Sequence, residues 1–222
     1  GNGRGTGGKS PLRLAMSVRI ALLDSGINDH HPHIRGQGEI VHGLSIDESG
    51  EWGDEPEPGD LLGHGTCAAA AILDLAPGCT ILSVKIFHTE PRCPFPRLLE
   101  ALDYAIAEGV DWINLSLGTT RPSRCEDLQK MIERASEAAI GIVAPAAIGE
   151  LACYPGALPG CHGVLADDSL SREQPEQRPH GDGKVWFASG RPRDLPGLPR
   201  DANLSGVSLA AANLTGFLAA AG

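Results

Sequence analysis

The chain has 222 residues, of which 41% are hydrophobic. This length and composition suit one globular α/β domain with a sizeable core and exclude a disordered chain. Its 18 Lys and Arg stand against 28 Asp and Glu, a formal net charge of −10, which argues against nucleic acid as the main partner. No apolar run approaches the ~20 residues that span a bilayer, so no membrane partner is expected.

Strand-like and helix-like patterns alternate along the chain. Residues 17–23 form a short run rich in Val, Ile and Leu, which predicts a buried strand ending at Asp24. The other predicted strands are 80–87, 111–117, 141–147, 161–166 and 184–188, and the predicted helices are 67–75, 95–106, 126–140 and 207–221. Loops are predicted for 44–62, 168–183 and 189–204, which are rich in Gly, Pro and charged residues. This alternation predicts an α/β fold, with a mainly parallel central sheet and helices on both of its faces.

Residues 1–12 are Gly-rich and basic, so we interpret them as a flexible lead-in to a single domain at 13–222. The chain shows no signal-peptide pattern, and Met16 directly precedes the first strand. These features favour a cytoplasmic location, although a secreted one stays open.

Three polar residues occur where such a sheet gathers its site, at strand carboxyl ends and helix amino termini. Asp24 follows the first strand, His64 lies in Gly-His-Gly-Thr at a helix start, and Ser208 lies in Gly-Val-Ser before the last helix. Each alone has a plainer explanation, as a turn aspartate, a surface histidine or a helix-capping serine. Together they predict a hydrolase in which Ser208 is the nucleophile, His64 the general base and Asp24 the carboxylate that orients it.

These motifs resemble those of the subtilisin-like serine proteases, the subtilases. The stretch 24–34 with its His31-Pro32 turn is similar to the family's aspartate motif, 63–66 matches the histidine motif, and 206–210 is similar to the serine motif. The order Asp, His, Ser separates this family from two other triad folds. The resemblance covers most of the chain and implies a three-layer α/β fold and a serine endopeptidase.

The resemblance also implies where a peptide binds. Residues 113–118 are similar to the strand that lines the family's substrate cleft, so Ser116, Leu117 and Gly118 are expected to pair with the substrate backbone.

The expected oxyanion hole departs from the family pattern. Family members usually read Ala-Ala-Ala-Gly-Asn after the fourth strand, and that Asn amide donates to the oxyanion. Here an ungapped count from Gly141 puts Glu150 at the Asn position, beside a second donor, the N–H of Ser208. An ionised Glu150 would repel the oxyanion, whereas a protonated one could donate.

The implied function is therefore a serine endopeptidase that processes a peptide or protein precursor, and the net charge favours neutral or basic peptide substrates. Two alternatives stay open. One is a catalytically impaired peptide-binding module, for which Glu150 speaks. The other is an acyl-transfer variant that cyclises peptides. The oligomeric state is left open.

Six cysteines permit disulfides. Loop placement favours the pairs Cys93–Cys125 and Cys153–Cys161 under oxidising conditions, whereas Cys67 and Cys79 lie in apolar elements.

No cofactor is expected with certainty. No Cys or His spacing suggests zinc, and His30, His31 and His33 are assigned to the His-Pro turn rather than to a metal site. Calcium is possible, but no acidic cluster identifies a site for it.

Overall fold

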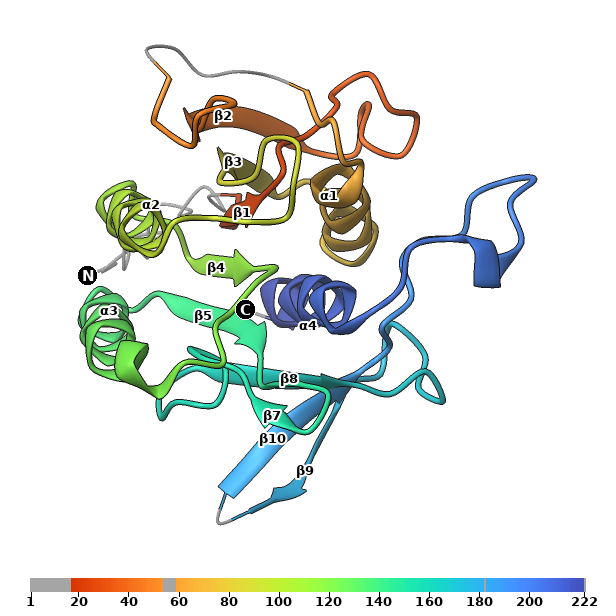
Figure 1. The fold of residues 1–222 in the computed structure, drawn as a ribbon. Coiled ribbons are helices and arrows are strands. Elements are labelled where there is room, and N and C mark those ends of the chain that lie inside the picture. Colours follow the sequence, from red (N-terminus) through yellow and green to blue (C-terminus); the bar gives the residue numbers. More distant parts are fainter. Residues whose placement is uncertain (1–16, 54–58, 182, 222) are drawn as a thin grey trace, which may run out of the picture.

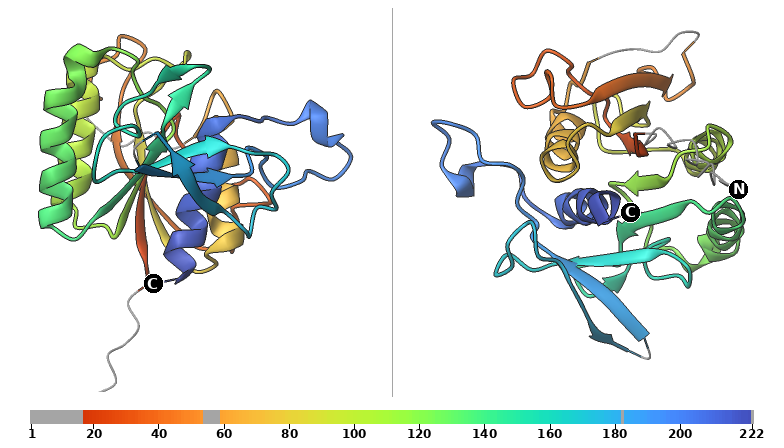
Figure 2. Two further views of the ribbon diagram at one scale, coloured as in Figure 1. Left: turned by 90° about the horizontal axis from the view of Figure 1, so that it is seen from below. Right: turned by 180° about the vertical axis from the view of Figure 1, so that it is seen from behind.

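The computed structural model describes residues 17–53, 59–181 and 183–221; the expected lead-in at 1–12 lies outside them. Their centre is an eight-stranded sheet in the order β2-β3-β1-β4-β5-β8-β10-β9. Every pair of neighbours is parallel except β10 and β9. Helices α2 and α3 cover one face, and α1 and α4 cover the other (Figures 1 and 2). The predicted three-layer α/β fold is confirmed.

The strands of this sheet are β1 (Arg19–Asp24), β2 (Glu39–Ser45), β3 (Thr80–Lys85), β4 (Trp112–Leu115), β5 (Gly141–Pro145), β8 (His162–Ala166), β9 (Glu176–His180) and β10 (Gly183–Ala188). A separate hairpin consists of β6 (Ala147–Ile148) and β7 (Leu151–Ala152). The helices are α1 (His64–Leu75), α2 (Phe95–Ala107), α3 (Cys125–Glu137) and α4 (Val207–Ala221), with short 3₁₀ turns η1 (Pro122–Arg124) and η2 (Arg200–Ala202). No helix in these described residues is long and apolar enough to cross a membrane.

The central strand β1 is apolar because both of its faces are covered. Ala21 and Leu23 pack into the cluster beneath α2 and α3, whereas Ile20 and Leu22 pack into the cluster beneath α1 and α4. A strand buried on both sides shows a continuous apolar run, which is the pattern that predicted it. Strand β1 therefore ends at Asp24, a buried polar residue that directly follows the apolar run.

Helices α1 and α4 lie in close contact on their shared face of the sheet. Both are rich in buried alanine, and Gly216 stands where α4 meets α1. A Cβ added at Gly216 would lie 2.9 Å from Leu75 Cβ and 3.1 Å from Ile72 O. Small residues thus bring the two backbones together, and the helices run side by side in the same direction, with both amino termini at one edge of the sheet (Figure 2, left).

Two strands of the eight-stranded sheet lie where no strand was predicted, and so does β7 of the hairpin. The edge strand β2 was missed because His42 and Gly43 interrupt its short apolar pattern, and it runs into the predicted loop 44–62. The strand β9 lies inside the predicted loop 168–183 and is almost wholly polar; it exists because it pairs with β10 at the other edge. Residues 54–58 of the first loop lie outside the described part of the chain.

The structure contains neither of the disulfide pairs that were expected under oxidising conditions. All six cysteines fall within the described residues, and all are free thiols. Burial raises the pKa of Cys67, Cys79 and Cys153 to about 11 and that of Cys93 to about 12. Burial raises the pKa of Cys161 as well. A thiolate is the reactive form, so these five thiols should be poor nucleophiles.

We therefore expect slow alkylation of the folded protein. At pH 8 iodoacetamide should modify these five cysteines far more slowly in buffer than in denaturant, where all six react without prior reduction. Mass spectrometry of the two samples measures this. A protein that needs reductant before all six cysteines react would contradict the free-thiol structure.

Candidate active site

The structure brings Asp24, His64 and Ser208 into one hydrogen-bonded chain. His64 Nδ1 lies 2.9 Å from each carboxylate oxygen of Asp24, and His64 Nε2 lies 2.8 Å from Ser208 Oγ. A carboxylate only accepts, so Nδ1 must carry the proton and donate it to Asp24. The lone pair of Nε2 is then free to accept from the Ser208 hydroxyl.

Three elements that meet at one edge of the sheet supply these residues. Asp24 ends β1, His64 is the first residue of α1, and Ser208 is the second residue of α4. Gly65 permits the approach of α1 to β1, because a Cβ there would lie 2.2 Å from Gly26 O. The glycine after the histidine is thus required by packing.

Burial and hydrogen bonds hold the Asp24 carboxylate in one orientation. Its side chain is only 1% exposed. Its Oδ1 accepts the N–H of Ser25 at 2.7 Å and, at 3.1 Å, shares the single Ser25 hydroxyl proton with Asp60. A buried carboxylate with several donors keeps one orientation, and here that orientation faces His64.

Asp60 is a site residue that sequence analysis missed. Its Oδ2 accepts the N–H and the hydroxyl of Thr66, each at 2.8 Å. Its Oδ1 accepts the N–H of Gly63 at 2.8 Å and the hydroxyl of Ser25 at 2.7 Å. Asp60 therefore caps the amino terminus of α1 and ties it to β1. An acidic residue shortly before the His64 helix was the available signal, but it lay in a segment treated only as an acidic loop.

His64 binds protons more readily than an ordinary histidine. Burial lowers its pKa, but the hydrogen bond and charge of Asp24 and the charge of Asp60 raise it by more, so the pKa of His64 is raised overall. The imidazolium that forms when His64 takes a proton is therefore stabilised in place.

The predicted substrate strand follows β4 directly and is half-buried. Leu117 and Gly118 make no backbone hydrogen bond to other described residues. Thr119 and Tyr154, by contrast, exchange two backbone N–H to C=O hydrogen bonds, each of 2.8 Å. Ser116 accepts a 3.3 Å hydrogen bond from Asn114 through its hydroxyl. An extended segment with unused backbone groups is what an added peptide strand needs.

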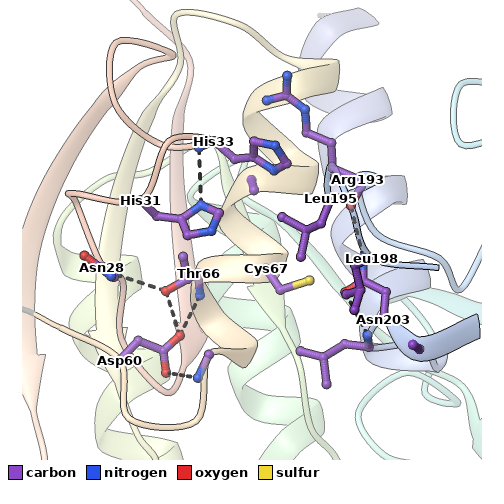
Figure 3. Close-up of a pocket in the computed structure, with 14 residues that line it drawn as sticks. Asn28, His31, His33, Asp60, Thr66, Cys67, Arg193, Leu195, Leu198 and Asn203 are labelled. Carbon is purple, nitrogen blue, oxygen red and sulfur yellow. Dashed lines mark hydrogen bonds between the residues drawn. The ribbon is translucent and has the colours of Figure 1, made fainter. Parts of the chain in front are cut away.

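Two grooves adjoin the site. One, of about 590 Å³, lies beside Leu117, Gly118 and Thr119 and reaches the start of α2 and η1. The other, of about 400 Å³, lies between α1, the 28–33 turn and the 193–204 segment (Figure 3). Figure 3 shows His31 and His33 on one wall of the second groove and Arg193 and Leu195 on the other.

Glu150 is exposed in the turn between β6 and β7. It lines a third groove of about 860 Å³, together with His180 and Lys184. No hydrogen bond joins Glu150 to Ser208 or His64 among the described residues, so the oxyanion assignment stays a prediction.

The His-rich turn forms no metal site in the described part of the chain. The rings of His31 and His33 meet edge to face at 5.3 Å, and no group of three or more His, Cys, Asp or Glu there could hold a metal ion. The N–H of His33 donates to His31 Nδ1 at 3.2 Å, which gives this turn a structural role.

Known proteins resemble this chain in both sequence and fold. The sequence profile of the Subtilase family (Peptidase_S8) matches residues 16–166. Subtilisin-like protease SBT6.1 of Arabidopsis thaliana is 33% identical over 108 residues, 46% of this chain and 10% of that protein. The major intracellular serine protease of Bacillus subtilis is 27% identical over 224 aligned positions, 91% of this chain and 67% of that protein. The chain thus spans about a tenth of the plant relative.

Two solved structures have the same fold. The prenylagaramide maturation protease PagA superimposes with a TM-score of 0.67 at 24% identity, over 92% of this chain and 74% of that one. A lanthipeptide protease superimposes with a TM-score of 0.68 at 21% identity, over 91% of this chain and 72% of that one. The family profile covers more than half of the chain and confirms what the three motifs predicted: the chain belongs to the subtilase family of subtilisin-like serine proteases.

Proposed function

We propose that this chain is an active serine endopeptidase. The observation that carries the proposal is the unbroken hydrogen-bonded chain from Asp24 through His64 to Ser208. Ser208 Oγ attacks the peptide carbonyl as His64 Nε2 takes its proton, and Asp24 stabilises the imidazolium. His64 returns that proton to the leaving amine, and water then releases the acyl group by the same steps.

The negative oxygen of the intermediate needs donors. Ser208 lies in the first turn of α4, where N–H groups have no partner within the helix and the helix dipole favours an anion. We propose the Ser208 N–H as one donor. Glu150 occupies the second position by sequence count, and this is the weak point of the proposed site.

We further propose that the substrate is a specific peptide or protein precursor. Of the two solved structures described above, one is a maturation protease and the other is a lanthipeptide protease. The half-buried substrate strand, flanked by grooves, supports selection among peptides rather than general digestion. The six free thiols support a reducing compartment such as the cytoplasm.

One alternative is a non-catalytic peptide-binding module, favoured by a carboxylate where the family has an amide. Peptide cyclisation would use the same residues and is recognised by product mass. A fluorophosphonate probe separates the module from the enzyme, because it labels only an activated serine.

Ser208→Ala should abolish both probe labelling and hydrolysis. The expected fall in kcat is about six orders of magnitude, the loss known for the same change in subtilisin. Ser205→Ala, three residues earlier on the exposed segment, is the control and should label normally. Thermal melts check that each variant folds. A folded Ser208→Ala protein with full activity would refute the assignment.

Asp60→Asn should move the acidic limb of the kcat/KM profile to lower pH. His64 acts as a base only when neutral, so activity rises with pH through its raised pKa. Removing the Asp60 charge lowers that pKa, so the neutral form appears at lower pH. Asp47 also accepts a backbone N–H, from Ser49 at 2.8 Å, and Asp47→Asn should leave the limb in place. NMR titration of His64 gives a second readout; an unmoved limb and unmoved titration would exclude an electrostatic role for Asp60.

Glu150→Asn should raise kcat/KM near neutral pH by at least tenfold. It replaces an exposed carboxylate with an amide donor, and the corresponding donor in subtilisin is worth ~2.7–4 kcal/mol. Glu150→Gln should help less, because its longer arm carries the amide too far. Glu137→Gln, an exposed change on α3, controls for net charge. Coincident profiles for wild type and Glu150→Asn would show that position 150 does not reach the oxyanion.

A further inference from the structure

The groove beside the substrate strand has a charge opposite to that of the whole chain. It is lined by residues of the chain before and at the start of α2, and by residues between β4 and α3: Pro91, Arg92, Cys93, Pro94, Phe95, Pro96, Leu98, Leu117, Gly118, Thr119, Arg121 and Arg124. Every charged side chain in this lining is an arginine, although the chain carries a net charge of −10.

The guanidinium groups of these three arginines form only weak ion pairs, or none, with other described residues. Arg92 meets Glu90 at 3.5 Å, but the two side chains are 85% and 66% exposed, and such pairs are weak. Arg124 lies 4.3 Å above the Phe95 ring, which orients it without neutralising it. Arg121 makes no ion pair with other described residues. Only its backbone N–H is engaged with Thr119, as donor to Oγ1 at 3.2 Å.

A neighbouring arginine, in contrast, has its charge neutralised by two carboxylates. Arg97 is paired with both Glu51 and Glu100, and it does not line the groove. The arginines that do line it have no comparable pair of carboxylates. The groove therefore presents positive charge to whatever lies along Leu117 and Gly118.

We propose that this groove selects substrates with an acidic segment beside the scissile bond. The proposal rests on the proposed function in one respect: the peptide must lie along Ser116–Gly118 as an added strand. In an extended strand alternate side chains point to the same side, about 6.6 Å apart. Two acidic residues at alternate positions can then reach the arginines, whose planar forks match carboxylates.

This preference is the reverse of what net charge alone predicts. Charges more than about 8–10 Å away are largely screened at physiological ionic strength, so the arginines beside the peptide dominate. The effect should be confined to one side of the scissile bond, because the groove lies beside Leu117, Gly118 and Thr119 and is lined by none of the three triad residues.

The test measures binding separately from catalysis. The probes are fluorescein-labelled ten-residue peptides of Ala, Leu and Ser that carry Glu-x-Glu, Gln-x-Gln or Lys-x-Lys. Fluorescence anisotropy with the Ser208→Ala protein should give the tightest binding for Glu-x-Glu and the weakest for Lys-x-Lys. Arg92→Glu/Arg121→Glu in this background should weaken Glu-x-Glu binding about tenfold and reverse the order. Both changes are at exposed side chains, so the fold should survive.

Arg35→Glu/Lys130→Glu is the matched control, because it changes the net charge equally at exposed positions outside the groove. It should keep the original order, and 1 M salt should flatten all differences. Equal binding of the three peptides, or an order unchanged in Arg92→Glu/Arg121→Glu, would overturn the proposal. Fluorophosphonate labelling of the wild-type protein tests the endopeptidase itself: if Ser208 is not labelled, the proposed function fails while the binding order still decides the groove.

In hydrolysis assays the Glu-x-Glu pair should be moved along the peptide, one position at a time. The gain in kcat/KM should appear only when the pair lies on one side of the cleaved bond, and it should vanish in Arg92→Glu/Arg121→Glu. A gain on both sides would show long-range attraction instead of a groove.

Discussion

The close contact between α1 and α4 is the constraint on which the site depends. His64 and Ser208 belong to different helices, and their side chains meet only if the helix axes approach closely and in register. Ile72 lies as far along α1 from His64 as Gly216 lies along α4 from Ser208, and these two positions touch. The alanine-rich faces and Gly216 therefore fix the 2.8 Å contact at the amino termini. A larger residue in the middle of α4 would separate His64 from Ser208 without touching either.

That arrangement has an electrostatic cost, since two helices aligned in one direction place two positive ends together. Asp24 and Asp60 supply negative charge at this point, one through His64 and one at the cap of α1. Both also raise the pKa of His64, although burial opposes them. The carboxylates thus stabilise the fold and prepare the base at the same time, so changes at Asp60 should affect stability and pH dependence together.

The sequence predicted what depends on local pattern. Asp24, His64 and Ser208 each carry their own motif, and the continuous apolar runs identified the central strands. Features that depend on tertiary contact were missed. Asp60 acquires its role only when its loop folds back onto α1, and β9 forms only because β10 offers an edge. The arginine groove combines Arg92 with Arg121 and Arg124 from separate segments. The net charge of the chain had instead favoured neutral or basic substrates.

The separation of His64 and Ser208 along the chain has a consequence for biosynthesis. The two side chains that touch are 144 positions apart, and α4 follows every strand of the sheet. A ribosome therefore releases the sheet-forming sequence before α4, which carries Ser208, can pack against α1 and the sheet. Until then the growing polypeptide holds His64 without Ser208. Under the proposed mechanism, neither it nor a prematurely terminated product can therefore cut the proteins of the cell that makes it.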